Sequence, residues 1–282
     1  MIGCLTSRHR GFSRPERDAI WKAALSPYYR AFGLDPASTP AAAGRAPFDA
    51  EAAALLSEFK PAVVSFHFGL PSRELLAQVT RTGSKILSSA TTVDEAVWLE
   101  THGADAIIAQ GLEAGGHRGM FLTEELTTQV GTLALVPQIV EKVRIPVIAA
   151  GGIADSRGVA AAMALGAAGV QVGTAYLLCE EATTSALHRA ALKSEAARHT
   201  AVTNLFTGRP ARGIVNRIMR ELGPISTASP AFPLAVSAMA PLRAHAERRG
   251  SDDFTPLWSG QNNRGCKEIS AGALTRELAA DL

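Results

Sequence analysis

Short runs of apolar residues recur through the middle of the chain, and each run is bounded by glycine or polar residues. Such runs predict strands that are buried on both faces of a sheet. The predicted strands cover residues 62–66, 85–89, 106–109, 145–150 and 169–174. Helical stretches separate them. The pattern therefore predicts an α/β fold with parallel strands and helical crossovers.

Capping residues and glycines mark the ends of the intervening helices. One helix is expected to start near Ser72 and a second at Thr92, in the capping-box sequence Thr92-Val93-Asp94-Glu95. A third is expected around residues 137–143, and a fourth is expected to start at Asp155 or Ser156. Gly103 is predicted to end the second of these helices, and Gly166 the fourth. Each helix then falls between two predicted strands, as a parallel sheet requires.

The segments outside this repeat suggest four parts. We expect a helical lead-in over residues 1–60, a parallel β/α barrel core over 61–182, a helical subdomain over 183–256, and a return with a C-terminal helix over 257–282. The subdomain prediction rests on helical patterns that are interrupted at Gly223-Pro224 and Ser229-Pro230.

Composition narrows the class of protein. With 282 residues, 47% of them hydrophobic, the chain can bury a full core. The 28 Lys and Arg nearly balance the 26 Asp and Glu, so charge gives no argument for binding nucleic acid or an anionic membrane. Cys4, Cys179 and Cys266 show neither metal-ligand nor disulfide spacing, and no run is apolar and long enough to span a bilayer. We expect a soluble cytoplasmic protein without a metal.

The string Gln110-Gly111-Leu112-Glu113-Ala114-Gly115-Gly116-His117-Arg118-Gly119 is the strongest candidate for a functional loop. It follows the carboxyl end of a predicted buried strand, the edge at which parallel α/β folds bind ligands. Its glycines allow the backbone to approach a flat ligand closely, and His117 is a group that titrates near neutral pH. A glycine-rich turn with an incidental surface histidine is the competing interpretation.

Two later strands end in Gly151-Gly152 and Gly173-Thr174. Bare backbone N–H groups and a threonine hydroxyl at such ends can bind an anion, and (β/α)8 barrels often bind phosphate after their last two strands. A doubly wound dinucleotide fold would need a Gly-x-Gly-x-x-Gly turn after an early strand, which is absent. The barrel is therefore favoured, although glycines required only by tight turns remain the alternative.

These strings resemble those of the nitronate monooxygenases, the flavin enzymes formerly called 2-nitropropane dioxygenases. The resemblance covers nearly the whole chain and is carried by residues 64–71, 110–119, 146–153, 169–174, 207–213 and 257–261. It implies a (β/α)8 TIM barrel that holds FMN non-covalently. The implied cofactor-binding residues are Gln110, Gly115, Gly151, Gly152, Gln171, Val172, Gly173 and Thr174.

The resemblance also implies a reaction. His117 would remove the α-proton of a nitroalkane, which suits a base that titrates near neutral pH. Family members then oxidise the nitronate with flavin and O2 to a carbonyl compound and nitrite, the redox chemistry belonging to the cofactor. Some relatives accept only the preformed nitronate, for which His117 would orient or polarise the substrate. His67 and Lys85 are weaker candidates at this site.

The chain departs from the family pattern in one respect. Only five of the eight barrel strands are recognisable, and they look like strands four to eight. A start assigned too late and a truly shortened gene would both explain this amino-terminally truncated barrel. An open sheet exposes its edges, so we expect weak or no FMN binding unless the termini cover the gap, and a homo-oligomer is compatible with it.

Two other functions stay open. An FMN-dependent enoyl-acyl-carrier-protein reductase would share the barrel, a similar Glu-Ala-Gly-Gly-His string and the phosphate glycines. A non-catalytic barrel remnant would keep only a folded surface.

Overall fold

The computed structural model describes residues 14–36 and 47–281. The chain forms two compact units. Unit 1 comprises residues 1–45, 202–210 and 216–256, and unit 2 comprises residues 46–201, 211–215 and 257–282. Each compact unit combines parts of several of the four segments expected from the sequence. The division into those four segments therefore stays a prediction.

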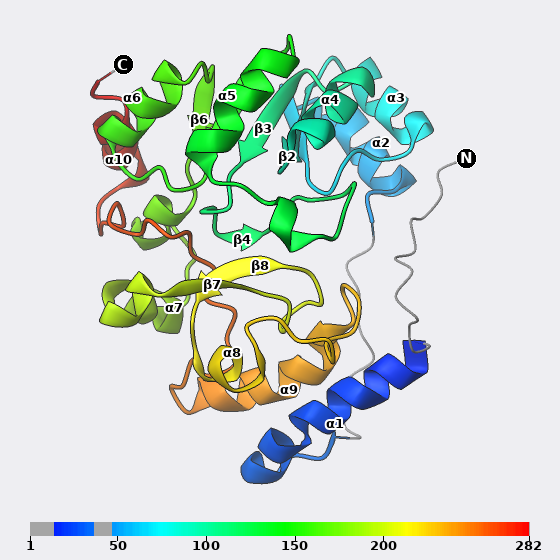
Figure 1. Ribbon diagram of the computed structural model, residues 1–282, viewed down its shortest axis with the longest axis vertical. Helices are drawn as coiled ribbons and strands as arrows, with labels where there is room; N and C mark the ends of the chain where they lie inside the picture. Colours follow the sequence, from blue (N-terminus) through cyan, green and yellow to red (C-terminus); the bar gives the residue numbers. More distant parts are fainter. Residues whose placement is uncertain (1–13, 37–46, 282) are drawn as a thin grey trace. The chain divides into compact units, whose positions relative to one another are not determined.

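Unit 2 is built on a five-stranded parallel sheet with the order β1-β2-β3-β5-β6 (Figure 1). The strands are β1 (Val63–Phe66), β2 (Lys85–Ala90), β3 (Ala106–Gln110), β5 (Val147–Ala150) and β6 (Gly169–Gln171). Each of the five predicted strands is confirmed to within a few residues. The largest difference is at the end of β6, where Thr174 starts the 3-10 helix η3 (Thr174–Leu178) instead of continuing the strand.

Helices connect the strands as the pattern predicts. Unit 2 contains α2 (Ala50–Phe59), α3 (Arg73–Arg81), α4 (Val93–Thr101), α5 (Thr132–Lys142), α6 (Ser156–Ala164), α7 (Ala186–Lys193) and α10 (Ala271–Leu278), with the short η2 (Leu126–Thr128) and η4 (Glu195–Arg198). Ser72, Thr92 and Asp155 are confirmed as N-caps. Gly103 (φ 103°) and Gly166 (φ 92°) follow helix ends in a left-handed conformation that favours glycine.

The central strand β3 is buried along its whole length, and α4 and α5 pack against it. Their contact faces supply Leu99, Leu135 and Ile139 to a core that also holds Ile107 and Ala109. Burial on both faces explains why β3 is a continuous apolar run without alternation. The Gln110–Gly119 loop begins at the end of this fully buried strand.

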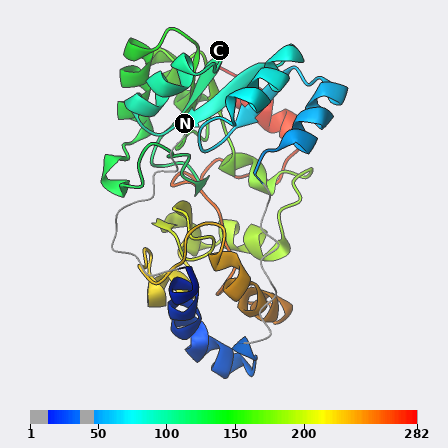
Figure 2. The same ribbon diagram turned by 90° about the vertical axis from the view of Figure 1, so that its right-hand side faces the viewer.

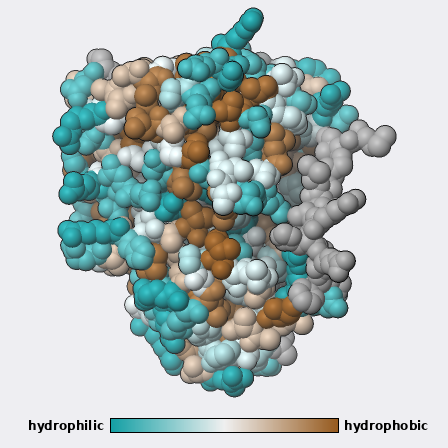
Figure 3. Space-filling model, viewed as in Figure 1, coloured by the Kyte–Doolittle hydropathy of each residue, from teal (hydrophilic) through white to brown (hydrophobic). Residues whose placement is uncertain are grey.

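Within the described residues, no strand pairs with the outer edge of β1 or of β6, so the sheet is open. Val63 on β1 is 50% exposed. The space-filling view in Figure 3 shows hydrophobic residues (brown) in patches among hydrophilic ones (teal). The five expected parallel strands are present, and the truncation of a barrel stays a prediction.

The residues expected to form a helical subdomain, 183–256, also contain strands. Two strands, β7 (Thr200–Thr203) and β8 (Ala211–Ile214), join β4 (Gly116–His117) in a second sheet of order β4-β8-β7. In this sheet β8 pairs antiparallel with β4, placing His117 opposite Ala211. Strand β8 was missed because its partner β4 is a two-residue strand about a hundred residues earlier.

The longer elements of unit 1 are helices. In both views α1 (Arg14–Phe32) and α9 (Ala235–Arg248) lie side by side (Figures 1 and 2), and α8 (Arg217–Leu222) belongs to the same unit. Trp21 and Tyr29 are buried and donate side-chain hydrogen bonds to the carbonyls of Ala235 (3.3 Å) and Ala238 (2.7 Å). Polar ends of buried aromatic residues are thus satisfied by main-chain carbonyls. No helix among the described residues is long and apolar enough to cross a membrane, and Cys4 lies outside them.

The core on β3 leads to a first prediction. Ile139 on α5 is fully buried, whereas Leu133 on the same helix is 70% exposed. Ile139→Ala should lower the free energy of unfolding by about 2–5 kcal/mol, because it removes buried methyl groups and leaves a cavity. Leu133→Ala, the matched control, should change it by less than about 0.5 kcal/mol. Urea titration followed by circular dichroism measures both, and equal effects would contradict this packing.

Candidate active site

The side chain of Gln110 holds the loop that carries His117. Its Nε2 donates to the main-chain carbonyl of His117 (2.9 Å), and its Oε1 accepts from the N–H of Gly119 (2.7 Å). One amide thus binds the backbone on both sides of Arg118. Gln110 was expected to contact the flavin, and that role stays a prediction; each polar atom of its amide already makes one bond within the protein.

Arg118 fixes the same loop from inside the fold. It is fully buried, and its guanidinium donates to the carbonyls of Gln110 (2.7 Å) and Gly111 (2.8 Å) and to Oε1 of Gln129 (3.0 Å). Burial and the nearby charge of Arg212 lower the pKa of Arg118 to about 10, against the opposing effect of Glu113 and Glu95. Arg118 is therefore still a cation at neutral pH, held largely by neutral oxygens.

Arg212 is a second buried cation beside the loop. Its Nε donates to the carbonyl of Leu112 (2.9 Å), and its Nη1 reaches the carbonyl and hydroxyl of Thr200 (3.3 and 3.2 Å). Burial lowers the pKa of Arg212, whereas the charge of Glu113 raises it. Three successive carbonyls, those of Gln110, Gly111 and Leu112, are thus bound by arginine side chains.

His117 itself is half-buried and has aromatic neighbours. Its ring centroid lies 5.6 Å from that of Trp258 and 6.0 Å from that of Phe68, the latter in an edge-to-face arrangement. The carbonyl of Trp258 is bound by Nε2 of His188 (3.0 Å), which holds this segment in place. Burial lowers the pKa of His188, favouring its neutral form. His188 therefore has a structural role beside the site.

His67 follows β1 and reaches the same loop. Its Nε2 lies 3.1 Å from the carbonyl of His117, and its Nδ1 lies 3.0 Å from the hydroxyl of Ser89. A carbonyl can only accept, so Nε2 carries a proton, and in the neutral ring Nδ1 accepts from Ser89. His67 is therefore a neighbour of the candidate base through its main chain. Lys85, in contrast, pairs with Asp105 (3.1 Å) at the amino end of β2, away from the carboxyl edge.

Gly151 and Gly152 form the turn after β5 with positive φ angles of 116° and 74°. Their carbonyls accept from Oγ1 of Thr132 and Nδ2 of Asn262 (both 2.9 Å). Among the described residues, no protein group accepts from the N–H of either glycine. Two adjacent free donors at a strand end are what an anion-binding turn requires.

Thr174 and Gly173 lie after β6. Oγ1 of Thr174 accepts from the N–H of Gly260 (2.9 Å), so its own proton is free to be donated. A methyl group added at Gly173 would meet no protein atom within 4 Å. The protein thus leaves open space beside this glycine, as a bound ligand group would need.

At Gly115, in contrast to Gly173, the neighbouring backbone leaves no space for a side chain. A methyl group there would lie 2.5 Å from the main-chain nitrogen of Gly260 and 2.6 Å from the carbonyl carbon of Ser259. The loop and the segment from Ser259 therefore touch backbone to backbone. The expected flavin contact of Gly115 stays a prediction, and packing already explains the residue.

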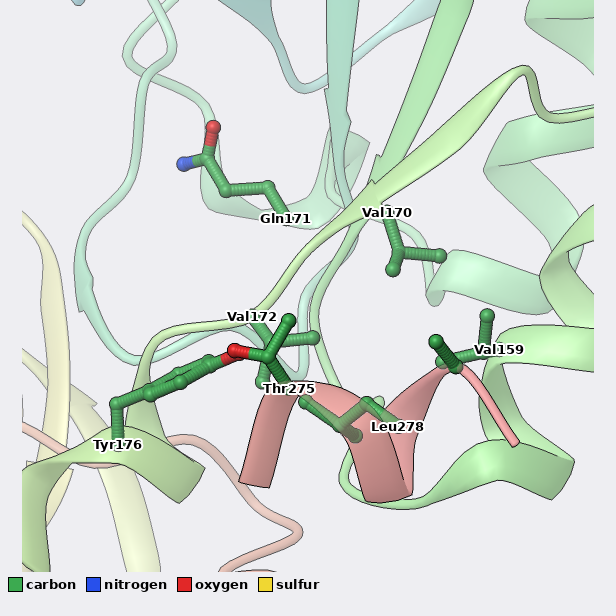
Figure 4. Close-up of a pocket in the computed structure, with 8 residues that line it drawn as sticks. Val159, Val170, Gln171, Val172, Tyr176, Thr275 and Leu278 are labelled. Carbon is green, nitrogen blue, oxygen red and sulfur yellow. The ribbon is translucent and has the colours of Figure 1, made fainter. Parts of the chain in front are cut away.

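Gln171 and Val172 line a cavity of about 430 Å³ where β6 meets α6 and α10 (Figure 4). Its other walls are largely apolar: Val159, Val170, Tyr176, Thr275, Leu278 and Ala279. Figure 4 shows Val170 and Gln171 pointing to opposite sides of β6. Val170 points toward the helices, whereas the side chain of Gln171 points away from them, and the expected part of Gln171 and Val172 in phosphate binding stays a prediction. No group of His, Cys, Asp and Glu in the described residues could hold a metal ion.

Comparison with known proteins agrees with this arrangement. A family model described as nitronate monooxygenase matches residues 29–281. A nitronate monooxygenase of Pseudomonas aeruginosa is 40% identical over 280 residues, which covers 97% of this chain and 79% of that protein. The chain belongs to the nitronate monooxygenase family. It is accordingly an enzyme, a flavin-dependent oxidoreductase.

Another relative and two solved structures are similar over most of the chain. A probable nitronate monooxygenase of Staphylococcus saprophyticus is 40% identical over 266 residues, covering 94% of this chain and 74% of that protein. The structure of nitroalkane oxidase from Streptomyces ansochromogenes aligns with a TM-score of 0.83 at 38% identity, over 95% of this chain and 76% of that one. FabK from Thermotoga maritima aligns less well, with a TM-score of 0.67 at 29% identity over 84% and 72%.

The glycines of the site lead to a second prediction. Gly115→Ala should lower the free energy of unfolding by about 1–3 kcal/mol, because its methyl group would push the Ser259–Gly260 backbone away. Gly173→Ala meets open space and should change stability by less than about 0.5 kcal/mol. Thermal and urea unfolding of the flavin-free proteins measure the difference. A Gly115→Ala variant as stable as wild type would show that this close approach is absent.

Proposed function

We propose that this enzyme oxidises nitronates or nitroalkanes with FMN and O2 to a carbonyl compound and nitrite. The observation that carries the proposal is the position of His117. Its backbone is fixed by Gln110, its ring lies near Phe68 and Trp258, and it belongs to the loop after the buried strand β3. A fixed, half-buried imidazole beside apolar rings is suited to remove a weakly acidic C–H proton.

His117 acts in this proposal as the base. Its imidazole takes the α-proton of a nitroalkane and leaves an anionic nitronate. The buried cations Arg118 and Arg212 lie behind the same loop, and their charge favours an anion there over the neutral acid. The apolar rings limit the access of water to the imidazole. With a preformed nitronate, His117 would orient the anion instead of generating it.

The residues after β5 and β6 fit the phosphate of FMN. The free N–H groups of Gly151 and Gly152 and the hydroxyl proton of Thr174 are donors, and the space at Gly173 is open. We therefore assign the FMN phosphate to these four residues. The flavin, when bound, supplies the electron transfer and the reaction with O2. Because the sheet is open in the described residues, we expect FMN to bind weakly.

An enoyl-acyl-carrier-protein reductase is the less well supported alternative. The matching family model is that of nitronate monooxygenases, and the nitroalkane oxidase structure aligns better than that of FabK. Rapid oxidation of NADH with an enoyl substrate would favour the reductase, as would the lack of any oxidation of a nitronate.

The role of His117 is tested with nitroethane and its preformed nitronate at saturating FMN. His117→Asn should lower kcat/KM for nitroethane by about 10²-fold or more, the usual contribution of a general base, and should affect the nitronate much less. His102→Asn is the control, because His102 is exposed at the end of α4 and stacks on Trp98. Equal losses with both substrate forms, or a wild-type enzyme that accepts only the nitronate, would contradict the base assignment.

The phosphate site is tested by Gly173→Ala. The variant should keep its stability but bind FMN at least roughly tenfold more weakly, because its methyl group would occupy the space assigned to the phosphate. Flavin fluorescence quenching during titration with FMN measures the dissociation constant. Riboflavin, which lacks the phosphate, is the control and should bind wild type and variant alike. Unchanged FMN affinity would place the phosphate elsewhere.

A further inference from the structure

A chain of buried polar side chains runs from α4 to the loop of His117. Glu95, Thr91 and Arg118 are fully buried, and Gln129 is nearly so. Arg118 donates to Oε1 of Gln129 (3.0 Å), Nε2 of Gln129 donates to the hydroxyl of Thr91 (2.9 Å), and that hydroxyl donates to Oε2 of Glu95 (2.7 Å). The cation and the carboxylate do not touch, but two neutral side chains connect them.

In each hydrogen bond of this network, only one of the two partners can be the donor. A guanidinium has no acceptor, so Gln129 must turn its oxygen toward Arg118 and its NH2 toward Thr91. The Thr91 hydroxyl accepts that bond and is left to donate its single proton to Glu95. Glu95 must therefore accept at this position. A network with one allowed orientation selects one arrangement of its members when every member is satisfied.

The two ends of the network bind the backbone on either side of His117. Before it, Arg118 binds the carbonyls of Gln110 and Gly111. After it, Oε1 of Glu95 accepts from the N–H groups of Phe121 (2.6 Å) and Leu122 (3.2 Å). Between these two ends, the main-chain carbonyl of His117 accepts hydrogen bonds from Gln110 and His67.

We propose that Glu95, acting through Thr91, Gln129 and Arg118, is a positioning residue for His117. The inference rests on the role of His117 as base in the proposed function. It assigns to the start of α4 a task in catalysis, although Glu95 lies on a helix beneath the site. Loss of any link leaves a buried donor or acceptor unsatisfied and allows the loop to shift.

Thr91→Val is the sharpest test, because valine keeps the shape of threonine but removes the hydroxyl that joins Gln129 to Glu95. At saturating FMN, kcat with nitroethane should fall by roughly tenfold or more, since a shift of about 1 Å can cost up to about 10²-fold. KM, bound FMN and kcat with the preformed nitronate should change by less than about threefold. Thr91→Ser keeps the hydroxyl and should stay within about twofold of wild type.

Glu100→Gln is the matched control on the same helix. Its carboxylate also accepts two main-chain N–H groups, those of Arg144 and Ile145, but it does so before β5, at the other end of the sheet. Glu95→Gln should reproduce the loss seen with Thr91→Val, whereas Glu100→Gln should behave as wild type. A similar loss of nitroethane activity in both glutamine variants would overturn the proposal.

Gln129→Met breaks the next link and replaces Thr91→Val if that variant does not fold by circular dichroism. In the double variant Thr91→Val/Gln129→Met, the two losses of kcat with nitroethane should not multiply, because both substitutions break the same connection. Multiplying losses, or an equal loss with nitroethane and its nitronate, would overturn the positioning role. The His117→Asn variant separates the failure of the network from the failure of the base assignment. A nitroethane-specific loss in His117→Asn, with no such loss in Thr91→Val and Gln129→Met, would refute only the positioning network. No nitroethane-specific loss in His117→Asn would refute the role of His117 as base.

Discussion

The buried guanidinium of Arg118 is the interaction on which the geometry of the site depends. A charge without water is costly unless hydrogen-bonded oxygens replace its hydration. The carbonyls of Gln110 and Gly111, at the end of β3, and the amide of Gln129 supply those oxygens. The loop therefore folds back over the strand end, with Arg118 fully buried and the neighbouring His117 half-buried.

The glycines divide into two groups with different physical reasons. Gly111 and Gly115 are required by backbone packing, since an added methyl group would collide with Thr132 or Gly260. Gly151 and Gly152 have positive φ angles and N–H groups without an acceptor among the described residues, and Gly173 borders open space. Only the second group has features that a ligand would use. In a glycine-rich string, some glycines are therefore required only by close backbone contacts, and the sequence alone does not distinguish them from glycines that bind a ligand.

The sequence predicted what depends on neighbours in the chain. Apolar runs located all five parallel strands, and local side-chain caps located Ser72, Thr92 and Asp155. Glu95 shows the limit. The capping box is half correct, because Thr92 accepts from the N–H of Glu95, but the Glu95 carboxylate binds Thr91, Phe121 and Leu122 instead of returning to Thr92.

What the sequence did not reveal depends on partners far along the chain. The pairing of β4 with β8, the bond from His67 to the carbonyl of His117, and the contact of Gly115 with Gly260 join segments that are 50 or more residues apart. No local pattern encodes them. His117 can serve as a precisely placed base only if the groups beneath it, which never touch the substrate, are held as firmly as the imidazole itself.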